Sequence, residues 1–272
     1  MKLTVGIPVY ITQELHAEFT EKTVASIKSK NHDLEIVILI NYCKPEYLER
    51  MEALGKVIMN SDGNCLASAW NEILDYGNET NADYILIPNN DLIFHPDCVD
   101  NLVKFAQEHI EYSMWTAAEW KGQTREETTT AIKSCMNNVP IGEGFDDHPH
   151  FSCFMVDKYF TGVLADKEEG TKEPKPGYFD ENIRPAYFED GDMHQRLLRL
   201  DLKAGKTATA LFYHYGSRTI AVDDELDLRN KHTYEKNRSY FISKWGFDPH
   251  NNVLDNNDLK RFIFKSAFEP KN

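Results

Sequence analysis

The chain has 272 residues, of which 41% are hydrophobic and 12% aromatic, and its formal net charge at pH 7 is -14. This composition can bury one substantial core, and it excludes a disordered or low-complexity protein. The negative charge argues against nonspecific binding of the whole molecule to nucleic acid or to anionic lipid.

The N-terminal residues alternate between apolar and small or polar side chains until Pro8, which is typical of a first strand and not of a signal peptide. No apolar run is long enough to cross a membrane. The five cysteines are scattered and form no CxxC pair, which favours reduced thiols. We therefore expect a cytoplasmic protein without an integral membrane segment, and no obligate protein partner is evident.

The first 110 residues alternate between strand and helix patterns. Strands are predicted at residues 3–9, 34–40, 56–59 and 84–88, and amphipathic helices at 18–29, 45–54, 66–77 and 96–109. This alternation predicts a mostly parallel sheet with helices on both faces. In such sheets ligands bind beyond the carboxyl ends of the strands, and here those ends are rich in Asn, Asp and Gly. The pattern indicates a nucleotide site along one polar rim.

The second half is less regular. Residues 116–139 are polar and predict at most one short helix, residues 150–156 resemble a strand, and the charged residues 166–177 predict an exposed loop. A helix is expected at residues 193–200, with Asp192 and Arg196 one turn apart and able to pair on its surface.

A further strand is expected at residues 208–213, followed by a helix at 231–245 and a short amphipathic segment at 258–268. We find no internal repeat and no clear linker. The sequence therefore predicts one catalytic domain over residues 1–219 and a helical extension over residues 220–272, packed on the active site or closing over it.

Five short motifs follow one another in a fixed order. They are Ile7-Pro8-Val9-Tyr10; Asn60-Ser61-Asp62-Gly63-Asn64, followed by Ala67, Ala69 and Asn71; Asn89-Asn90-Asp91; Gly177 to Glu181 before Phe188-Glu189-Asp190-Gly191-Asp192; and His214-Tyr215-Gly216-Ser217. In this order the chain resembles the family 2 type glycosyltransferases of the GT-A fold over about residues 2–219. The resemblance implies an α/β fold with a mostly parallel central sheet, helices on both faces and a C-terminal helical extension.

The resemblance also implies a metal site. In that family the last residue of a DxD-like triplet binds the metal, and this position is Asp91. Asn89 replaces the first acid, so the site should hold free metal weakly and fill mainly when the nucleotide arrives. His214 matches a later histidine that completes the metal sphere or touches the diphosphate, and an imidazole suits Mn²⁺ better than Mg²⁺. A turn cap at residues 89–91 and a structural histidine are the alternatives.

By the same resemblance, Asp190 is the general base that deprotonates the acceptor hydroxyl, and a direct displacement inverts the anomeric carbon. Glu189 and Asp192 would support it or orient the acceptor. An acidic helix N-terminus without catalytic function is the alternative. His150 and Phe151 are expected to line the acceptor pocket. One alternative is a zinc site formed by four residues: Cys135, His148, His150 and Cys153. Their spacing matches no regular zinc finger.

The donor contacts implied by the resemblance are Pro8, Val9, Tyr10, Asn41, Asp62, Gly63, Asn64, Asn89 and Asn90. Many relatives have an Asp where this chain has Asn41, and an amide can still hydrogen bond to uracil, so UDP is the first choice. Three basic residues would close over the diphosphate: Arg218, Arg229 and Lys244. Alternatively, this last helix packs on the core through its aromatic residues.

These features together predict a metal-dependent inverting glycosyltransferase that uses Mn²⁺ or Mg²⁺ and a nucleotide-sugar donor. Two other classes remain open. A sugar nucleotidyltransferase on a related scaffold would require a Gly-rich loop with a basic residue after Val9, which this chain does not have. A noncatalytic carbohydrate-binding protein would tolerate loss of Asp190. The acceptor could be a glycan, a lipid-linked sugar, a protein or a modified nucleic acid base.

Overall fold

The computed structural model describes residues 1–216 and 224–249, without the side chains of residues 224–231. Within these residues the central element is a mixed sheet of nine strands. Its strand order is β3-β2-β1-β4-β8-β6-β9-β5, and β7 pairs with β9 outside this path. The predicted residues Arg218 and 258–268 lie outside the described residues, and so does the Arg229 side chain.

The first half is a series of parallel β/α units, as the sequence predicts. Its elements are β1 (Lys2–Ile11), α1 (Glu14–Ser26), β2 (Asp33–Cys43), α2 (Pro45–Glu52), β3 (Lys56–Met59), α3 (Leu66–Glu79) and β4 (Tyr84–Pro88). β1 pairs in parallel with β2 on one side and with β4 on the other. Each predicted strand and helix is found within a few residues of its expected position, because these segments carry a clear local periodicity.

The second half brings antiparallel strands into the same sheet. Its elements are β5 (Leu92–Phe94), α4 (Cys98–Glu108), β6 (Met114–Glu119), α5 (Arg125–Lys133), β7 (Phe145–Asp146), β8 (Cys153–Asp157), α6 (Phe160–Lys167), α7 (Glu189–Arg199) and β9 (Ala204–His214). β8 runs antiparallel to β4 and to β6, whereas β6 and β9 are parallel. Consequently β1, β4, β6 and β9 all end at the same edge of the sheet.

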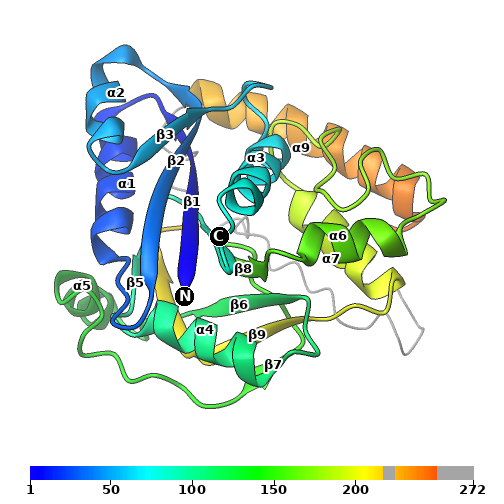
Figure 1. Ribbon diagram of the computed structural model, residues 1–272. Helices are drawn as coiled ribbons and strands as arrows, with labels where there is room; N and C mark the ends of the chain where they lie inside the picture. Colours follow the sequence, from blue (N-terminus) through cyan, green and yellow to red (C-terminus); the bar gives the residue numbers. More distant parts are fainter. Residues whose placement is uncertain (217–223, 250–272) are drawn as a thin grey trace.

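Helices cover both faces of the sheet (Figure 1). One apolar core lies between the sheet and α1, α2 and α4, and includes Val5, Leu102 and Phe212. The other lies between the sheet and α3, α6 and α7, and includes Trp70 and Leu197. Burying a fully apolar side chain in such a core contributes about 1.5–3 kcal/mol, so these two cores fix the strand ends that carry the polar rim.

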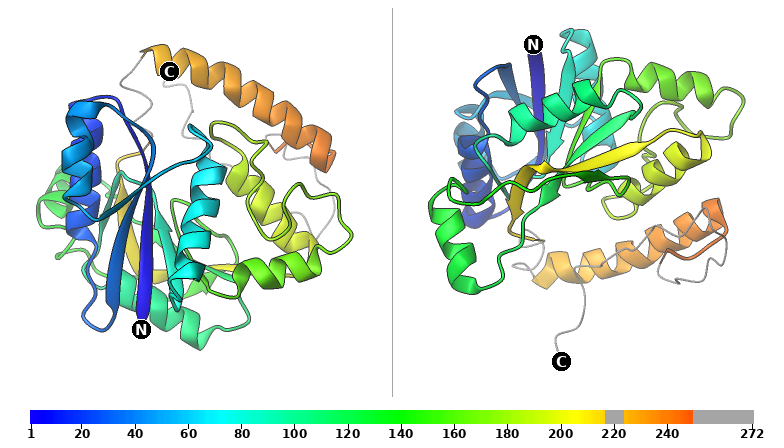
Figure 2. Two further views of the ribbon diagram at one scale, coloured as in Figure 1. Left: turned by 45° about the horizontal axis from the view of Figure 1, so that its top comes forward. Right: turned by 90° about the horizontal axis from the view of Figure 1, so that it is seen from below.

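The last described helix, α9 (Asp224–Trp245), lies alongside α7 (Figure 2). Phe241 is 1% exposed and packs in a third apolar cluster with Ile183 and Phe188. Among the described residues, no helix combines the length and the apolar composition that crossing a bilayer demands.

Most of residues 166–177 are exposed, as predicted, but Glu168 is 2% exposed and binds Arg196 through two hydrogen bonds of 2.7 Å. The predicted surface pair within α7 is wrong. Arg196 also lies 3.9 Å from Asp192, but both side chains are buried and do not pair on the surface. A bidentate pair of this kind is strong and geometrically specific, so it holds the loop against α7.

Candidate active site

Asp91 and His214 meet at the carboxyl edge of the sheet. β5 and β9 pair so that Leu92 lies opposite His214, and the Tyr215 amide donates a 3.0 Å hydrogen bond to the Asp91 carbonyl. This pairing brings Asp91 Oδ1 within 3.0 Å of His214 Nε2, with side-chain exposures of 6% and 16%. Burial alone would lower the pKa of His214, but the contact with Asp91 more than offsets it and leaves the pKa raised.

The Asp91–His214 pair has the donor atoms that a Mn²⁺ or Mg²⁺ site requires. A carboxylate oxygen and an imidazole nitrogen are both ordinary ligands of Mn²⁺. Two ligands about 2.1 Å from one ion and at right angles to each other are about 3.0 Å apart. The observed separation is that of a hydrogen bond between the two side chains, and it would also let both atoms reach one divalent cation in place of the shared proton.

Asn89 and Asn90, which precede Asp91, are tied to neighbouring elements. The backbone N–H of Asn89 donates a 2.8 Å hydrogen bond to the backbone carbonyl of Ser152. Asn90 is 9% exposed, and its Nδ2 donates to Thr20 Oγ1 on α1 at 3.1 Å. These bonds fix the turn between β4 and β5 and with it the position of Asp91.

Glu119, the last residue of β6, connects the two halves of the site. His150 Nε2 lies 3.3 Å from Glu119 Oε2, and Lys121 Nζ lies 3.3 Å from the same oxygen. Burial alone would raise the pKa of Glu119, but His150 and the other cations around it, including His214, lower it. Sequence reasoning missed Glu119. The signal was present, since an acid follows the apolar run Met114-Trp115-Thr116-Ala117-Ala118 just as acids follow other strands.

Asp190 and Glu189 form the first turn of α7, where Tyr187 and Phe188 take positive φ values of 79° and 78° and turn the chain into the helix. Burial raises the pKa of Asp190, although His150 acts in the opposite sense. The pKa of Glu189 lies well above its ordinary value, because of burial and of the neighbouring charge of Asp190. Among the described residues, Glu189 Oε2 has no hydrogen-bond partner. This pair therefore favours an ionised Asp190 beside a protonated Glu189.

The predicted donor contacts also lie at this edge. The pairing of β1 with β2 shifts register after Val9, so Tyr10 pairs with Tyr42 and Asn41 is the extra residue. The rings of Tyr10 and Tyr42 lie 5.2 Å apart, and Asn41 Oδ1 accepts a 2.5 Å hydrogen bond from Asn60. Pro8 and Val9 are buried in the strand.

The turn after β3 carries Asp62, Gly63 and Asn64 on the surface. Gly63 has a φ of 69°, a backbone conformation that glycine adopts without strain. The Asp62 carboxylate is paired with the Arg184 guanidinium, so this turn is linked to the segment that leads into α7. Arg184 was not singled out from the sequence, because nothing local indicates a partner 122 residues away.

Three residues with predicted roles are largely buried. Asp192 is 0% exposed, and Phe151 is packed against Phe154 with ring centroids 5.6 Å apart. Lys244 does not face a diphosphate, because its Nζ contacts three carboxylates at 2.7–2.9 Å: Glu173, Asp180 and Asp192. Trp245 Nε1 donates to Asp192 Oδ1 at 2.9 Å. These contacts hold α9 on α7.

The zinc alternative is wrong. Among the described residues, the ligand atoms of Cys135, His148, His150 and Cys153 form no group of three or more that could hold a metal. Cys153 is fully buried in β8, whereas Cys135 is exposed. The group that does come within 4.8 Å is Glu173, Asp180 and Asp192, and the side chains of Lys244 and Arg196 already pair with its carboxylates.

Comparison with solved structures supports the fold. The mannosyltransferase PcManGT from Pyrobaculum calidifontis, in complex with GDP-Man and Mn²⁺, is 11% identical with a TM-score of 0.51, over 79% of this chain and 57% of that one. GalNAc-T7 with UDP, GalNAc and Mn²⁺ is 12% identical with a TM-score of 0.53, over 78% of this chain and 43% of that one. The chain thus matches about half the length of each, and the predicted GT-A fold is confirmed.

A search of curated protein sequences finds no match. The sequence model named Glycosyl transferase family 2, however, matches residues 4–159, which is more than half of the chain. The protein is therefore a member of glycosyl transferase family 2.

Proposed function

We propose that the protein is a metal-dependent inverting glycosyltransferase that moves a sugar from a nucleoside-diphosphate donor to an acceptor hydroxyl. The observation that carries this proposal is the 3.0 Å contact between Asp91 and His214 at the edge of the sheet. Glu119 and His150 connect this pair with Asp190. At the start of α7, Glu189 and Asp192 are buried, whereas Asp190 is partly exposed. A cation-binding pair and a candidate base thus belong to one linked group.

Asp91 and His214 would hold the cation, Mn²⁺ or Mg²⁺. When bound, it would neutralise the charge that develops on the departing diphosphate. Asn89 leaves Asp91 as the one acidic side chain of the triplet, so the nucleotide itself completes the site. Mn²⁺ is the first choice because of the imidazole ligand.

Asp190 would act as the general base. The acceptor oxygen attacks the anomeric carbon from the face opposite the diphosphate, the bond to the diphosphate oxygen breaks, and the hydroxyl proton passes to Asp190. The configuration of the anomeric carbon is inverted. Burial raises the pKa of Asp190 and makes it a better proton acceptor. Glu189, whose pKa is higher still, would remain protonated and support the base without competing for the proton.

The donor would lie along the rim formed by Pro8, Val9, Tyr10, Asn41, Asp62, Gly63, Asn64, Asn89 and Asn90. UDP is the first choice for the nucleotide. Asn41 offers a side-chain amide where many relatives have a carboxylate that hydrogen bonds to the nucleobase. The Asn41 side-chain oxygen already accepts a hydrogen bond from Asn60, which leaves the Asn41 amide N–H groups for the base. His150, in the segment before β8, is the proposed acceptor contact, since its ring is 30% exposed beside Glu119. The cytoplasmic location expected from the cysteine pattern is part of this proposal.

The domain division at residue 219 is likewise a proposal. Under it, residues 220–272 form an extension whose helix α9 holds the base-bearing helix α7 through Lys244 and Trp245. Within the described residues, Lys244 and Trp245 would therefore influence the active site through α7.

Turnover of nucleotide sugars tests the function. The purified chain is incubated with UDP-, GDP- and TDP-sugars, with Mn²⁺ or with EDTA, and release of the nucleoside diphosphate is measured. We expect a UDP-sugar to be hydrolysed slowly in a reaction that requires Mn²⁺. Asp190→Asn should lower the rate by about 10²–10⁴-fold while UDP still raises the melting temperature.

The matched control is Asp201→Asn, which removes an exposed acid from the turn after α7. It should leave the rate unchanged. Turnover that persists in EDTA, or that survives Asp190→Asn, would reject the proposed mechanism.

A further inference from the structure

The side-chain amide of Asn60 is fixed by backbone groups on both sides. Asn60 is 9% exposed, and its Oδ1 accepts hydrogen bonds from the backbone N–H of Asp62 at 3.0 Å and from Ser68 Oγ at 3.1 Å. Its Nδ2 donates to the backbone carbonyl of Cys65 at 3.1 Å. A backbone N–H can only donate and a backbone carbonyl can only accept, so the oxygen and the nitrogen of this amide cannot be exchanged.

The fixed amide of Asn60 decides the orientation of its neighbour, Asn41. Asn60 Nδ2 also donates a 2.5 Å hydrogen bond to Asn41. Because this nitrogen can only donate, the Asn41 atom that faces it must be the oxygen, Oδ1. No residue that the structure describes accepts a hydrogen bond from Nδ2 of Asn41, and Asn41 is half-buried at the end of β2. The two N–H groups of Asn41 are therefore the groups that it can offer to a ligand.

An aromatic surface lies beside Asn41. The register of β1 with β2 shifts after Val9, so Asn41 is the extra residue and Tyr42 pairs with Tyr10. Tyr42 is 43% exposed, and the centroids of the two tyrosine rings are 5.2 Å apart. Every nucleobase has a face that can stack on an aromatic ring. Aromatic rings next to a pair of N–H donors suit a planar base.

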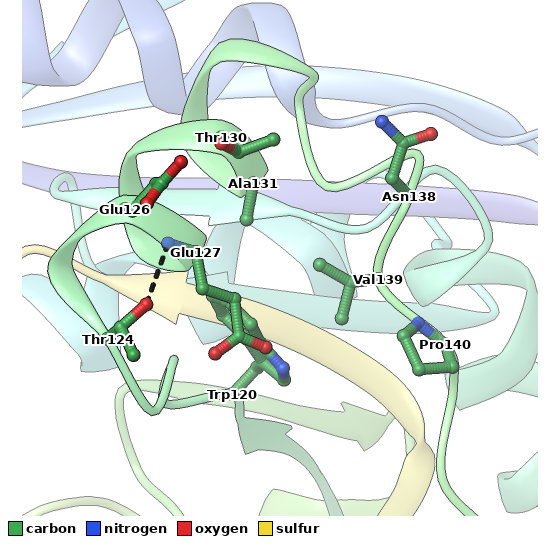
Figure 3. A pocket seen from close by; sticks show the side chains of 9 residues that line it. All are labelled: Trp120, Thr124, Glu126, Glu127, Thr130, Ala131, Asn138, Val139 and Pro140. Atoms are coloured by element: carbon green, nitrogen blue, oxygen red, sulfur yellow. Dashed lines mark hydrogen bonds between the residues drawn. The ribbon is translucent and has the colours of Figure 1, made fainter.

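The pocket beside α5 is a less suitable place for a nucleotide. It has a volume of about 340 Å³ and lies between α5 and residues 138–140 (Figure 3). Among the described residues, its lining includes Glu126 and Glu127 but no Lys or Arg. Two carboxylates without a basic side chain would repel a diphosphate.

The donors of Asn41 match only part of the edge of a pyrimidine. Uracil presents O2 and O4 as acceptors and N3–H as a donor, whereas cytosine presents O2 and N3 as acceptors and its amino group as a donor. N–H groups can bind O2 of either base, but they cannot accept the N3–H of uracil. A carboxylate would accept the N3–H of uracil and repel the N3 lone pair of cytosine. An amide held in this orientation therefore lacks the means to prefer uracil.

We propose that Asn41, oriented by Asn60, presents only hydrogen-bond donors to the nucleobase, so that the site has no preference for uracil over cytosine. This inference rests on the proposed function, because it concerns the nucleotide of the same donor. Asn41 contacts the base, and Asn60 is a positioning residue that acts through Asn41. The site thus accepts CDP as well as UDP.

Isothermal titration of the whole chain with UDP and with CDP, both in the presence of Mn²⁺, tests the proposal. We expect the Kd for CDP to be no more than about threefold above the Kd for UDP in the wild type. Asn41→Asp keeps the hydrogen bond from Asn60 and makes the free end of the side chain an acceptor. This variant should shift the ratio of the two Kd values by about tenfold in favour of UDP.

Two further variants test how Asn41 acts. Asn41→Ala removes the donors and should weaken both nucleotides by similar factors, with the ratio unchanged. Asn60→Asp replaces the donor that holds Asn41 by an oxygen, so the Asn41 amide should turn, offer its oxygen to the base and shift the ratio in favour of UDP. If Asn60→Asp does not fold, Asn41→Asp decides the question. The matched control, Asn31→Asp, adds the same charge at an exposed position before β2 and should leave the ratio unchanged.

The inference is overturned if the wild type binds UDP more than threefold more tightly than CDP. It is also overturned if Asn41→Asp changes the ratio by less than threefold. Release of nucleoside diphosphate from UDP-sugars is measured on the same samples. Turnover by a wild type that strongly prefers UDP would reject this inference alone. Equal binding of UDP and CDP without turnover of any nucleotide sugar would reject the proposed function and leave the nucleobase site standing, and failure to bind either nucleotide would reject both.

Discussion

Lys244 Nζ lies 2.8 Å from Asp192 Oδ1, and this contact ties the last described helix to the helix that begins with Glu189 and Asp190. Burial alone would lower the pKa of Lys244, but Asp192 and the neighbouring acids more than offset it and raise the pKa. Burial raises the pKa of Asp192, and Lys244 opposes that shift. The ion pair is therefore charged at neutral pH and mostly shielded from solvent, so its partners depend on each other.

Lys244→Met should destabilise the fold and slow turnover. Removing one partner of a buried ion pair costs about 3–5 kcal/mol, because the buried carboxylates lose their nearest counter-charge and keep only Arg196, which lies 3.6 Å from Glu173 and 3.9 Å from Asp192. We expect the free energy of unfolding, measured in urea, to fall by that amount. Because Lys244 acts through α7 and touches no reacting atom, kcat should fall with little change in the KM for the donor.

Lys236→Met is the matched control, since it removes an exposed lysine from the same helix. Its effect on unfolding should stay within about 0.5 kcal/mol. Equal losses in the two variants would show that Lys244 has no special role in holding α7.

The sequence predicts the parallel half of the fold well, because each of its elements has its own periodicity and its own turn residues. It does not predict β6. Met114 to Glu119 is a short, largely apolar stretch that ends in an acid, but it runs directly into the polar residues up to 139, and its strand partners β8 and β9 come later in the chain. Glu119 was missed with it.

In the candidate site, too, local sequence predicts the positions of residues but not their contacts with distant partners. Asp91 and His214 each follow an apolar strand, so their positions at the rim are predictable, but their 3.0 Å contact depends on the register of β5 with β9. The buried pair of Glu168 with Arg196 was not predictable from local sequence, because residues 166–177 have the charge, Pro and Gly content of a loop. Partners distant in the chain decide which charges are buried.

The pH dependence of turnover should follow Asp190. Its pKa lies above the ordinary value of about 3.9, so the base becomes protonated at a higher pH than a free aspartate would. We expect kcat/KM to fall as the pH decreases through this raised value, with an acid limb above about 3.9. A profile that is flat down to pH 4 would contradict the role of Asp190 as the base.

Glu189→Gln should preserve activity and improve stability at higher pH. A carboxyl whose pKa is raised on folding stabilises the fold fully below its unfolded pKa of about 4.3 and loses that contribution as the pH rises through the native value. Glutamine mimics the protonated form and removes this dependence. Urea unfolding at pH 5 and pH 8 measures the difference.

Glu169→Gln, an exposed change, is the control and should follow the wild type at both pH values. If Glu189→Gln inactivates the protein while leaving it folded, Glu189 must act as an ionised group, and the assignment of the two carboxyls would have to be reversed.

Asn89→Asp should strengthen the binding of free Mn²⁺. The wild type has Asp91 as the one acid of its triplet, so it should bind Mn²⁺ weakly alone and more tightly with UDP. A second carboxylate near the ion is worth roughly 1.4 kcal/mol or more, which is about tenfold in affinity. The free Mn²⁺ signal in electron paramagnetic resonance titrations measures this.

Asn81→Asp makes the same charge change at the opposite end of β4, where the residue is exposed. It should leave the affinity for Mn²⁺ nearly unchanged. If the affinity for Mn²⁺ rises equally in both variants, the effect comes from net charge, and residues 89–91 do not hold the ion.

Gly6→Ala should destabilise the sheet beneath the donor rim. A Cβ at Gly6 would lie 2.2 Å from Ile73 Cγ2, so β1 and α3 could not keep their present separation. Overpacking of this kind costs about 1–3 kcal/mol. Gly162→Ala is the contrasting change, because nothing lies within 4 Å of its Cβ in α6, and it should gain roughly 0.5–1 kcal/mol from helix propensity.

Combining Gly6→Ala with Ile73→Ala should cost less than the sum of the two single changes, since the second removes the atoms that the first meets. Additive losses measured by urea unfolding would show that Gly6 and Ile73 do not press on each other.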